Sequence, residues 1–373
     1  MARDPMIVHV RTSQPFGSWS RFLRGVGRFA LEHGRWSLRV GSVPGAAEGA
    51  AELAGAAGLI TWDAGLYARA QAIGLPAVAA YNVEFDAPRV ALNDARVGAT
   101  AAEYLLRLGH RRLTMWGVDR VWARRRWEGF DRAARARGVR PDRIDAAWSG
   151  GEDQLSDRLA ALPAPTGLFA ANDGQARRAI RLLHGLGRRV PEDVAVLGVD
   201  NNPVDCEFHQ PGISSVDTDP ERAGYETASL LEAMINGRPI GRPLVVPPRR
   251  VVERDSTRYL GFDDPLLSEA VAWLRAHAFE PVRVADVLNV VPLSRRRLEQ
   301  LFREQLGHSP GEEVRRVRMA RARTLLIESR VELIDVAVRC GFASLSSFSQ
   351  TFKREHGVSP GRYRKAHASP IAG

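Results

Sequence analysis

The feature that most constrains this chain is a sequence pattern that occurs twice, fifty residues apart. The run from Ser294 to Gly311 aligns with the run from Ser344 to Gly361, and seven of the 18 positions are identical. Each run begins with a serine, whose hydroxyl can accept a hydrogen bond from a free amide at the start of a helix. Each then reaches Gly-x-Ser-Pro, in which Gly307 or Gly357 suits a left-handed C-cap and a helix stop. The pattern predicts two equivalent capped helices.

Each capped helix has an apolar stripe and a shorter apolar helix in front of it. Leu298 and Phe302, like Phe348 and Phe352, are four residues apart and fall on one helix face. The preceding segments, "VADVLNVV" and "ELIDVAVRCGF", lie only a few residues before the capped helices. Two helices joined by so short a turn form a helix-turn-helix. A generic helical bundle would explain one copy, whereas the duplication with a shared stop favours two helix-turn-helix units.

The opposite face of each capped helix carries side chains that suit DNA. Arginine can bind guanine and glutamine can bind adenine through paired hydrogen bonds in the major groove, and serine can also bind base edges. Lys353 and Arg354 are better matched to phosphates. The candidate DNA-contacting residues are Arg295, Arg296, Glu299, Gln300, Arg303, Leu345, Ser346, Ser349, Gln350, Lys353 and Arg354.

The segment between the two copies predicts a rigid connecting helix. Residues 312–330, "EEVRRVRMARARTLLIESR", carry apolar side chains at helical spacing. About 16 helical residues would span roughly 24 Å at about 1.5 Å per residue, and successive major-groove faces on one side of B-DNA lie about 34 Å apart. We therefore expect the doubled pattern to place two recognition helices in adjacent turns of the groove.

The first 245 or so residues have a different pattern, in which short β-rich runs alternate with helical stretches. The alternation begins with "MIVHV" and "SRFLRGVGRFALEHG" and continues through "TGLFAAND" and "VAVLGVD". Strands and helices in turn predict a parallel sheet with helices on both faces. The strands are too many for one small sheet, so we expect an α/β fold of two doubly wound lobes with a cleft between them.

A proline-rich, basic segment at 242–265 interrupts this alternation, because proline cannot continue a helix. Beyond it every segment has a helical period, and the sequence contains no further strand pattern. We therefore predict a first domain over residues 1–250, a linker over 251–265 and an all-α domain over 266–373.

Charge and cysteine content limit the possible functions. The chain has 53 Lys and Arg against 43 Asp and Glu, a formal charge of +10, and residues 264–373 hold +6 of it (18 Lys and Arg against 12 Asp and Glu). A basic balance fits a polyanionic partner. Cys206 and Cys340 lie far apart without a CxxC or a zinc-like histidine spacing, so we expect apolar fillers, no metal site and no cofactor.

The sequence also predicts a cellular compartment. Its apolar runs fall short of the roughly 20 residues that span a bilayer. The first residues, "MARDPMIVHV", lack the basic, apolar and small-residue regions of a signal peptide. We therefore expect a cytoplasmic protein without membrane association.

Polar residues at strand ends predict a sugar-binding cleft in the first domain. In open α/β sheets ligands sit beyond the carboxyl ends of the strands, where Asn172 and Asp173 follow one strand and Asp200 follows the next. A carboxylate accepts two hydroxyl hydrogen bonds, which suits a sugar. Arg126 is placed to hold the opposite edge of the sugar with a fork of donors, and Asp94 is a further candidate. The alternative for the residues at strand ends is a helix cap or a surface turn.

Aromatic residues in the same half are candidates for stacking on a sugar face. Those near strand ends are Phe16, Trp19, Trp62 and Trp122. Because aromatic side chains at such positions also pack in cores, the alternative for each is a core or rim position. We assign Phe16 to the predicted sugar site.

The last third of the chain resembles the AraC-type DNA-binding domain over about 100 residues. The resemblance is carried by "LSRRRLEQLFREQLGHSP", the helix that follows it, and "IDVAVRCGFASLSSFSQTFKREHGVSPGRYR". It implies base-facing positions for Arg296, Glu299, Gln300, Ser346, Ser349 and Gln350.

Residues 6–252 resemble the periplasmic-binding-protein-like effector domain of LacI-type repressors. Arg126 and Asp200 match the family's ligand arginine and aspartate, and Asn172 with Asp173 matches its Asn-Asp pair. LacI-type proteins carry their DNA-binding segment before this domain, whereas here the AraC-type part follows it. The layout resembles regulators in which the two families are fused. That resemblance implies D-xylose as effector, activation of D-xylose utilisation genes, a homodimer, and double-stranded operator DNA and RNA polymerase as partners.

Other functions compete with this interpretation. A regulator of the same architecture could respond to another pentose or hexose. A sugar-processing enzyme could share the two-lobed half, but the sequence has no GxxxxGK[ST] phosphate loop and no HExxH zinc motif, so we predict no catalytic residues. A solute-binding protein would need an export signal and no DNA-binding tail. We therefore expect a sugar-responsive transcription regulator and not an enzyme.

Overall fold

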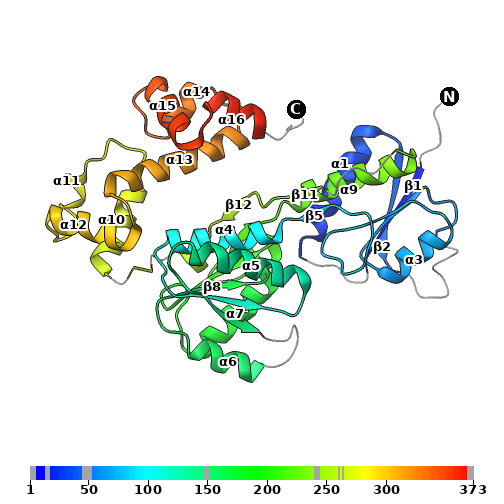
Figure 1. Cartoon of the computed structure of the whole chain (residues 1–373), viewed down its shortest axis with the longest axis horizontal. Coiled ribbons are helices and arrows are strands. Elements are labelled where there is room, and N and C mark those ends of the chain that lie inside the picture. The colour runs from blue at the N-terminus through cyan, green and yellow to red at the C-terminus, as the bar shows by residue number, and fades with distance from the viewer. Residues whose placement is uncertain are drawn as a thin grey trace. The chain divides into compact units, whose positions relative to one another are not determined.

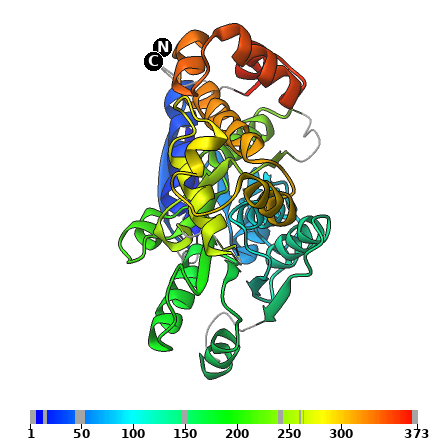
Figure 2. The same ribbon diagram turned by 90° about the vertical axis from the view of Figure 1, so that its left-hand side faces the viewer.

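The structure, a computed structural model, describes residues 6–12, 17–43, 53–145, 152–238, 244–258, 261–262 and 264–367. The chain divides into two compact units, Met1–Gly261 and Phe262–Gly373. In Figures 1 and 2 the first unit runs from blue to yellow-green and the second from yellow to red. The division falls inside the segment where the prolines interrupt the strand and helix alternation.

The first lobe of the first unit is built on a parallel sheet of four strands in the order β2-β1-β3-β4. The register pairs Val8 of β1 with Leu38 on one side and Gly58 on the other. The lobe also contains α9, a helix from much later in the sequence, which packs beside α1 (Figure 1). Its elements are β1 (Met6–Thr12), α1 (Trp19–His33), β2 (Trp36–Ser42), β3 (Gly58–Thr61), α3 (Ala64–Ala72), β4 (Ala77–Ala79) and α9 (Pro220–Ile235).

The second lobe has a six-stranded sheet in the order β12-β10-β9-β8-β6-β7. The expected two-lobed fold with parallel sheets is confirmed, and one strand departs from it because β12 runs antiparallel to β10. The elements are α4 (Asp94–Arg107), β6 (Leu113–Gly117), α5 (Val121–Arg135), β7 (Asp142–Asp145), α6 (Glu152–Ala160), β8 (Thr166–Ala170), α7 (Asp173–Gly185), β9 (Val194–Val199), α8 (Pro203–Glu207), β10 (Ser214–Asp217), β12 (Arg250–Val252) and the short 3₁₀ helix η1 (Asp255–Thr257).

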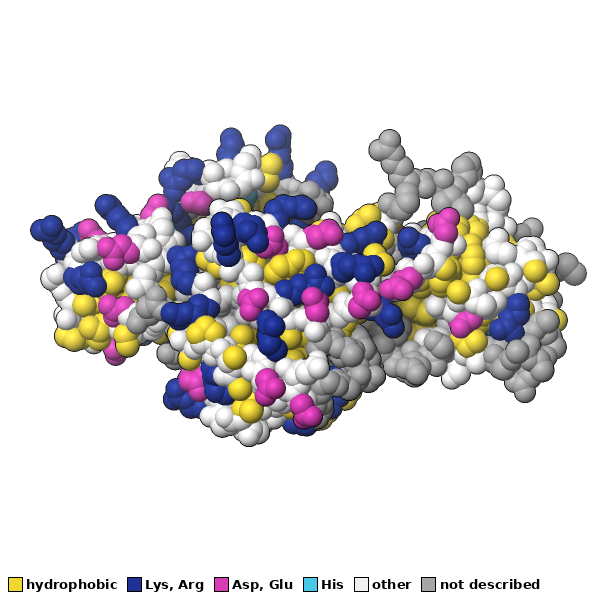
Figure 3. Space-filling model, turned by 60° about the horizontal axis from the view of Figure 1, so that its bottom comes forward, with side chains coloured by type: hydrophobic (Ala, Val, Ile, Leu, Met, Phe, Trp, Pro, Cys, Tyr) yellow, Lys and Arg dark blue, Asp and Glu magenta, His cyan; other side chains and the backbone are white. Residues whose placement is uncertain are grey.

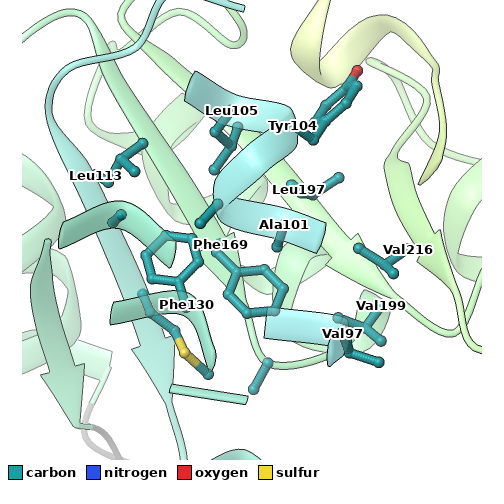
Figure 4. Close-up of a cluster of buried hydrophobic side chains, with 14 of the residues drawn as sticks. Val97, Ala101, Tyr104, Leu105, Leu113, Phe130, Phe169, Leu197, Val199 and Val216 are labelled. Carbon is teal, nitrogen blue, oxygen red and sulfur yellow. The ribbon is translucent and has the colours of Figure 1, made fainter. Parts of the chain in front are cut away.

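The core of the second lobe fixes α4 and α5 against the strands that carry the predicted site. Phe130 of α5 stacks on Phe169 of β8, with ring centroids 5.1 Å apart (Figure 4). Full burial of one such side chain contributes about 1.5–3 kcal/mol to stability. The other buried residues labelled in Figure 4 are Val97, Ala101, Tyr104, Leu105, Leu113, Leu197, Val199 and Val216.

The chain crosses between the lobes at several points. β5 (Ala91–Leu92) pairs in parallel with β11 (Val245–Val246), and these two strands form a small separate sheet.

The linker expected over 251–265 overlaps the first unit, because β12 extends the six-stranded sheet. Ser256 is fully buried, and its hydroxyl donates to the carbonyl oxygen of Val196 at 2.6 Å. The prolines do stop the helices, but the extended backbone that they favour completes an edge of the sheet.

In the second unit the described residues form helices and turns, as expected for an all-α domain. In Figures 1 and 2 the long helix α13 runs between the helices of the two halves of this unit. The elements are α10 (Pro265–Ala276), α11 (Val284–Val287), α12 (Arg295–Leu301), the π-helix η2 (Phe302–Leu306), α13 (Pro310–Glu328), α14 (Leu333–Arg339), α15 (Leu345–His356) and α16 (Pro360–His367).

The surface mixes charges of both signs. Figure 3 shows many Lys and Arg side chains on one face, with Asp and Glu side chains among them. The excess of arginine alone therefore does not locate a binding site on this face. None of the helices formed by the described residues is both long enough and apolar enough to cross a lipid bilayer.

Candidate functional site

The first candidate site lies where helices α4 and α5 meet. A Cβ atom on Gly98 would lie 1.8 Å from the carbonyl oxygen of Arg126, and one on Gly129 would lie 1.8 Å from a carbonyl oxygen of α4. The two helices can therefore touch only because both positions are glycine. Their contact places Asp94, the first residue of α4, against Arg126. The Arg126 Nε donates to Asp94 Oδ1 at 2.9 Å, and the side chains are only 1% and 4% exposed.

Asp200 belongs to the same group of charges. It follows β9 with a φ of 100°, a conformation that residues other than glycine rarely adopt. Burial raises the pKa of Asp200, while the positive charge of Arg126 opposes this shift. Burial also raises the pKa of Asp94, against the attraction of Arg126, and the negative charge of Asp200 adds to this shift. The structure thus joins two of the predicted sugar-site residues, Asp94 and Arg126, in a buried ion pair, and the charge of Asp200 interacts with both.

A pocket of about 290 Å³ opens beside Asp94. Its wall includes Asn82, from the segment after β4, and Trp122 and Arg125 from the start of α5. The ring of Trp122 lies 4.6 Å from the guanidinium carbon of Arg126. Ligand pockets commonly measure about 300–1,000 Å³. The volume therefore suits a monosaccharide better than a larger ligand.

Asn172 and Asp173 have other partners. Asn172 caps α7, where its side chain accepts from the amide of Gln175 at 2.8 Å. Asp173 is buried and accepts from the amide of Asn202 at 2.8 Å and from the hydroxyl of Ser215 at 2.6 Å. Burial raises its pKa to about 8, and the charge of Asp200 adds to the shift. Asn172 is therefore a helix cap, as the alternative predicts, and Asp173 supports the loop before α8. A sugar contact of either residue stays a prediction.

The aromatic candidates separate into two groups. Phe16 lies outside the described residues. Trp19 and Trp62 pack edge to face with ring centroids 5.1 Å apart, and Tyr81 lies 6.1 Å from Trp62. Trp19 and Trp62 are partly buried and pack against the core of the first lobe, as the core-or-rim alternative predicts. Trp122 lines the pocket beside Asp94.

Sequence reasoning missed Asn82 and Arg21. Asn82 follows the buried strand β4 with a φ of 61°, so the rule that singled out Asp200, a polar residue after a strand, would have found it. Arg21 is one of several arginines on α1; it is buried, and its Nη1 donates to the carbonyl oxygen of Asp200 at 3.1 Å. No local sequence pattern separates a buried arginine from its exposed neighbours.

The second candidate site consists of the two capped helices. The hydroxyl of Ser294 accepts from the amide of Arg297, and that of Ser344 accepts from the amide of Ser347, each at 3.2 Å. The left-handed caps have φ values of 76° and 74° and are Gly307 and Gly357. The predicted caps are therefore confirmed. So is the buried apolar stripe, which consists of Leu298, Phe302, Phe348 and Phe352.

The two copies differ in detail. α15 is an α-helix throughout, whereas the first copy changes from α12 to the π-helix η2 at Phe302. The helix before it, α11, is short, and the chain reaches Pro292, which has no amide hydrogen to donate, before the next cap. The connecting helix α13 starts at Pro310 and has 19 residues. It therefore spans about 28 Å, somewhat more than expected.

The candidate DNA-contacting side chains lie at the surface. All are exposed except Glu299 and Ser349, which are half-buried. Arg295 pairs with Glu299 at 3.1 Å, and the side-chain Nε2 of Gln300 donates to Glu304 Oε1 at 2.7 Å. The exposed surfaces of the two capped helices thus carry both cationic and amide side chains, which suit the major groove of DNA. The base contacts of single residues stay predictions.

Glu313 joins the first helix-turn-helix to α13. It is almost fully buried, accepts from Arg275 Nε at 2.7 Å and lies 2.7 Å from His308 Nε2. Burial alone would raise the pKa of Glu313. The hydrogen bond with His308 and the charge of Arg275 more than offset burial, so the pKa falls to about 2.

We expect Glu313→Gln to destabilise the second unit near neutral pH by about 3 kcal/mol, the cost of breaking a buried ion pair. Because the folded pKa lies below the usual value of about 4.3, ionised Glu313 stabilises the fold above that value. This contribution is lost as the pH falls from about 4 to the folded pKa of about 2. Urea unfolding of both proteins between pH 2 and 7, followed through the hydrogen exchange of amides in the second unit, measures the difference. Glu269→Gln, at an exposed position of α10, is the control. An equal loss of stability in Glu313→Gln at every pH would contradict the prediction.

The letters Gly-x-Ser-x-Gly, which also spell the nucleophile elbow of some hydrolases, occur at 307–311 and 357–361. An elbow places its serine on a turn from a strand into a helix. Here Ser309 is the N-cap of α13 and follows a helix, and its hydroxyl bonds both the amide and the carboxylate of Glu312. The motif is a helix cap and does not indicate a hydrolase.

Both units match known families. Residues 102–257 match a family described as a periplasmic binding protein-like domain, and residues 287–366 match a helix-turn-helix domain. The xylose operon regulatory protein of Escherichia coli (strain K12) is 31% identical over 258 residues, which are 68% of this chain and 65% of that protein. The protein of the same name from Haemophilus influenzae is 29% identical over 218 residues, 58% of this chain and 56% of that one. This chain thus spans 65% and 56% of the lengths of these relatives, less than two thirds of each.

A solved structure shares the whole architecture. The structure described as the xylose-binding transcription activator xylR aligns over 99% of this chain and 100% of that chain, with a TM-score of 0.61 and 24% identity. At this identity the likeness shows a common fold. The chain combines a periplasmic binding protein-like domain with a helix-turn-helix domain, and it is homologous to the xylose operon regulatory proteins.

Proposed function

We propose that this chain is a transcription regulator that binds a sugar with its first unit and operator DNA with its second. The observation that carries the proposal is the buried ion pair of Asp94 and Arg126, which interacts with the charge of the half-buried Asp200 and lies, through Asp94, beside a pocket of monosaccharide size. Carboxylates and a guanidinium at strand ends are the groups that bind sugar hydroxyls. The two capped helix-turn-helix units in the same chain supply the means of acting on DNA.

D-xylose is the proposed effector and activation the proposed effect. The names of the two relatives and the description of the solved structure support xylose, and that description, which names a transcription activator, supports activation. In our mechanism the sugar bridges the lobes and favours the closed form. Closure then changes how a homodimer presents four helix-turn-helix units to DNA and to RNA polymerase. Another pentose or hexose is the alternative effector, because the pocket size alone does not separate them.

A melting-shift screen of the full chain tests the sensor function. At a sugar concentration of about 100 times the dissociation constant, binding raises the free energy of unfolding by about 2.7 kcal/mol. We therefore expect D-xylose to raise the melting temperature by several degrees, with smaller shifts for other pentoses and hexoses. A disaccharide is the control. The sensor function would have to be given up if all these sugars left the melting temperature unchanged, and consumption of the sugar would indicate an enzyme.

We expect Gln350→Ala to weaken binding to an operator, a DNA sequence selected for tight binding to the wild type, by about 1–3 kcal/mol. This is the discrimination that one base contact provides. Binding to unrelated DNA should change little, because Gln350 is exposed on α15 and carries no charge. Fluorescence anisotropy with both DNAs measures the difference. Lys353→Ala on the same helix is the comparison, since loss of a phosphate contact weakens both DNAs. An equal loss on both for Gln350→Ala would make this residue a backbone contact.

A further inference from the structure

Arg21 connects the two lobes at the candidate sugar site. It lies on α1 in the first lobe and is almost fully buried. Its Nη2 donates to both carboxylate oxygens of Asp217 at 2.9 Å. Its Nη1 donates to the backbone carbonyl oxygen of Asp200 at 3.1 Å. One guanidinium from the first lobe therefore holds two points of the second.

The first of these points lies where the chain crosses between lobes. Asp217 is the last residue of β10, and the chain continues directly into α9 of the first lobe. Asp217 Oδ1 also accepts from the amide of Asp219, and Asp219 in turn caps α9 by accepting from the amide of Arg222. The position of the Arg21 guanidinium is thereby tied to the geometry of this crossing.

The second point is the backbone of a strained loop. Asp200 and Asn201 have successive φ values of 100° and 50°. Such conformations are unfavourable for residues other than glycine and persist only where the surroundings hold them. The amide of Asp200 donates to the carbonyl oxygen of Val216 at 3.0 Å, and that of Asn201 donates to the hydroxyl of Ser215 at 2.9 Å. Arg21 adds a charged donor to this loop from the opposite lobe.

We propose that Arg21 is a positioning residue for the sugar site, which holds Asp200 in its ligand-presenting conformation and links that conformation to the lobe crossing at Asp217. A planar guanidinium can bind a carboxylate and a carbonyl at once, whereas the point charge of a lysine is poorly suited to do so. The inference rests on the proposed function in one respect, the assignment of Asp200 as a sugar ligand. The positioning of the loop does not depend on that assignment.

The experiment compares three variants of the full chain with the wild type. Arg21→Met alone leaves Asp217 buried without its cation and is expected to lose stability. The informative pair is Asp217→Asn and the double variant Arg21→Met/Asp217→Asn, since these two differ only at Arg21 and neither holds an unpaired Asp217 carboxylate. Arg28→Met is the control, because Arg28 lies on the same helix and pairs at the surface with Glu32 and Glu221.

Hydrogen exchange without sugar gives the deciding measurement. In the double variant we expect the amides of residues 200–202 to exchange about tenfold faster or more than in Asp217→Asn, as for the loss of one charged hydrogen bond. Arg28→Met should match the wild type. Equal exchange in the double variant and in Asp217→Asn would overturn the proposal, because Arg21 would then serve only to neutralise Asp217.

Calorimetric titration with D-xylose adds the functional readout. We expect the double variant to bind about tenfold more weakly or worse than Asp217→Asn. Asp217→Asn should have the lower melting temperature, because it leaves the Arg21 guanidinium buried without its carboxylate, so lost stability would not explain the weaker binding of the double variant. Equal affinity in the two variants would count against positioning. If the wild type bound none of the pentoses and hexoses, the proposed sensor function would fail, while hydrogen exchange at 200–202 would still decide the role of Arg21.

Discussion

Asp200→Asn is expected to abolish measurable sugar binding and to leave sugar-free operator binding unchanged. A carboxylate accepts two hydroxyl hydrogen bonds with its charge, whereas an amide has a single acceptor oxygen. A hydrogen bond to a charged group contributes about 1.5–3 kcal/mol, so the weakening of both hydroxyl hydrogen bonds lowers the affinity by about a hundredfold or more. The amide has the same shape and removes a carboxylate whose pKa burial has raised, so the fold should keep its stability. Calorimetric titration with D-xylose and anisotropy with operator DNA measure the two functions.

The exposed Asp255→Asn in the same unit is the control for this change. An unaltered sugar affinity would remove Asp200 from the site, and a loss of sugar-free DNA binding would show that the substitution disturbs the fold. The wild type offers a second check through pH. Because the folded pKa of Asp200 is raised, the ionised acceptor is lost on acidification at a higher pH than for an ordinary aspartate.

The helix-turn-helix units could be predicted from sequence because their signals are local. A serine cap, an apolar pair four residues apart and a C-cap glycine all lie within 18 residues, and the structure confirms them at Ser294, Ser344, Gly307 and Gly357. The change to a π-helix at Phe302 has no such signal, because the two copies have phenylalanine at the same position.

The sugar site was less predictable because its geometry depends on residues that are distant in sequence. The pair of Asp94 and Arg126 forms only because Gly98 and Gly129 let two helices touch. Asn172 and Asp173 were ambiguous for another reason. A polar residue after a strand can bind a ligand or can support the local backbone, and the sequence does not distinguish the two roles. Pairing of β12 with β10 is likewise non-local, so the proline-rich segment looked like a linker from sequence alone.

Ala320→Pro in the connecting helix is expected to weaken operator binding by about a hundredfold and to shorten the footprint to one turn of the duplex. Ala320 is exposed near the middle of α13, and proline there removes a helical hydrogen bond and clashes with the preceding turn, at a cost of about 3 kcal/mol. The second half of α13 packs on the second helix-turn-helix through Met319, Ala322 and Leu326. Proline is favoured at the first position of a helix, so this half can restart at residue 320 and both units should stay folded.

The size of this effect follows from the linkage between the two units. When two modules engage DNA together, the second binds at a high effective concentration, and this advantage of about 10²–10⁴ is lost when the geometry no longer allows joint binding. Footprinting and anisotropy of the full chain measure the protected length and the affinity. Ala320→Ser keeps the helix and is the matched control. Two protected turns and an unchanged affinity in Ala320→Pro would mean that α13 does not set the spacing of the recognition helices, and the doubled pattern would then need another explanation.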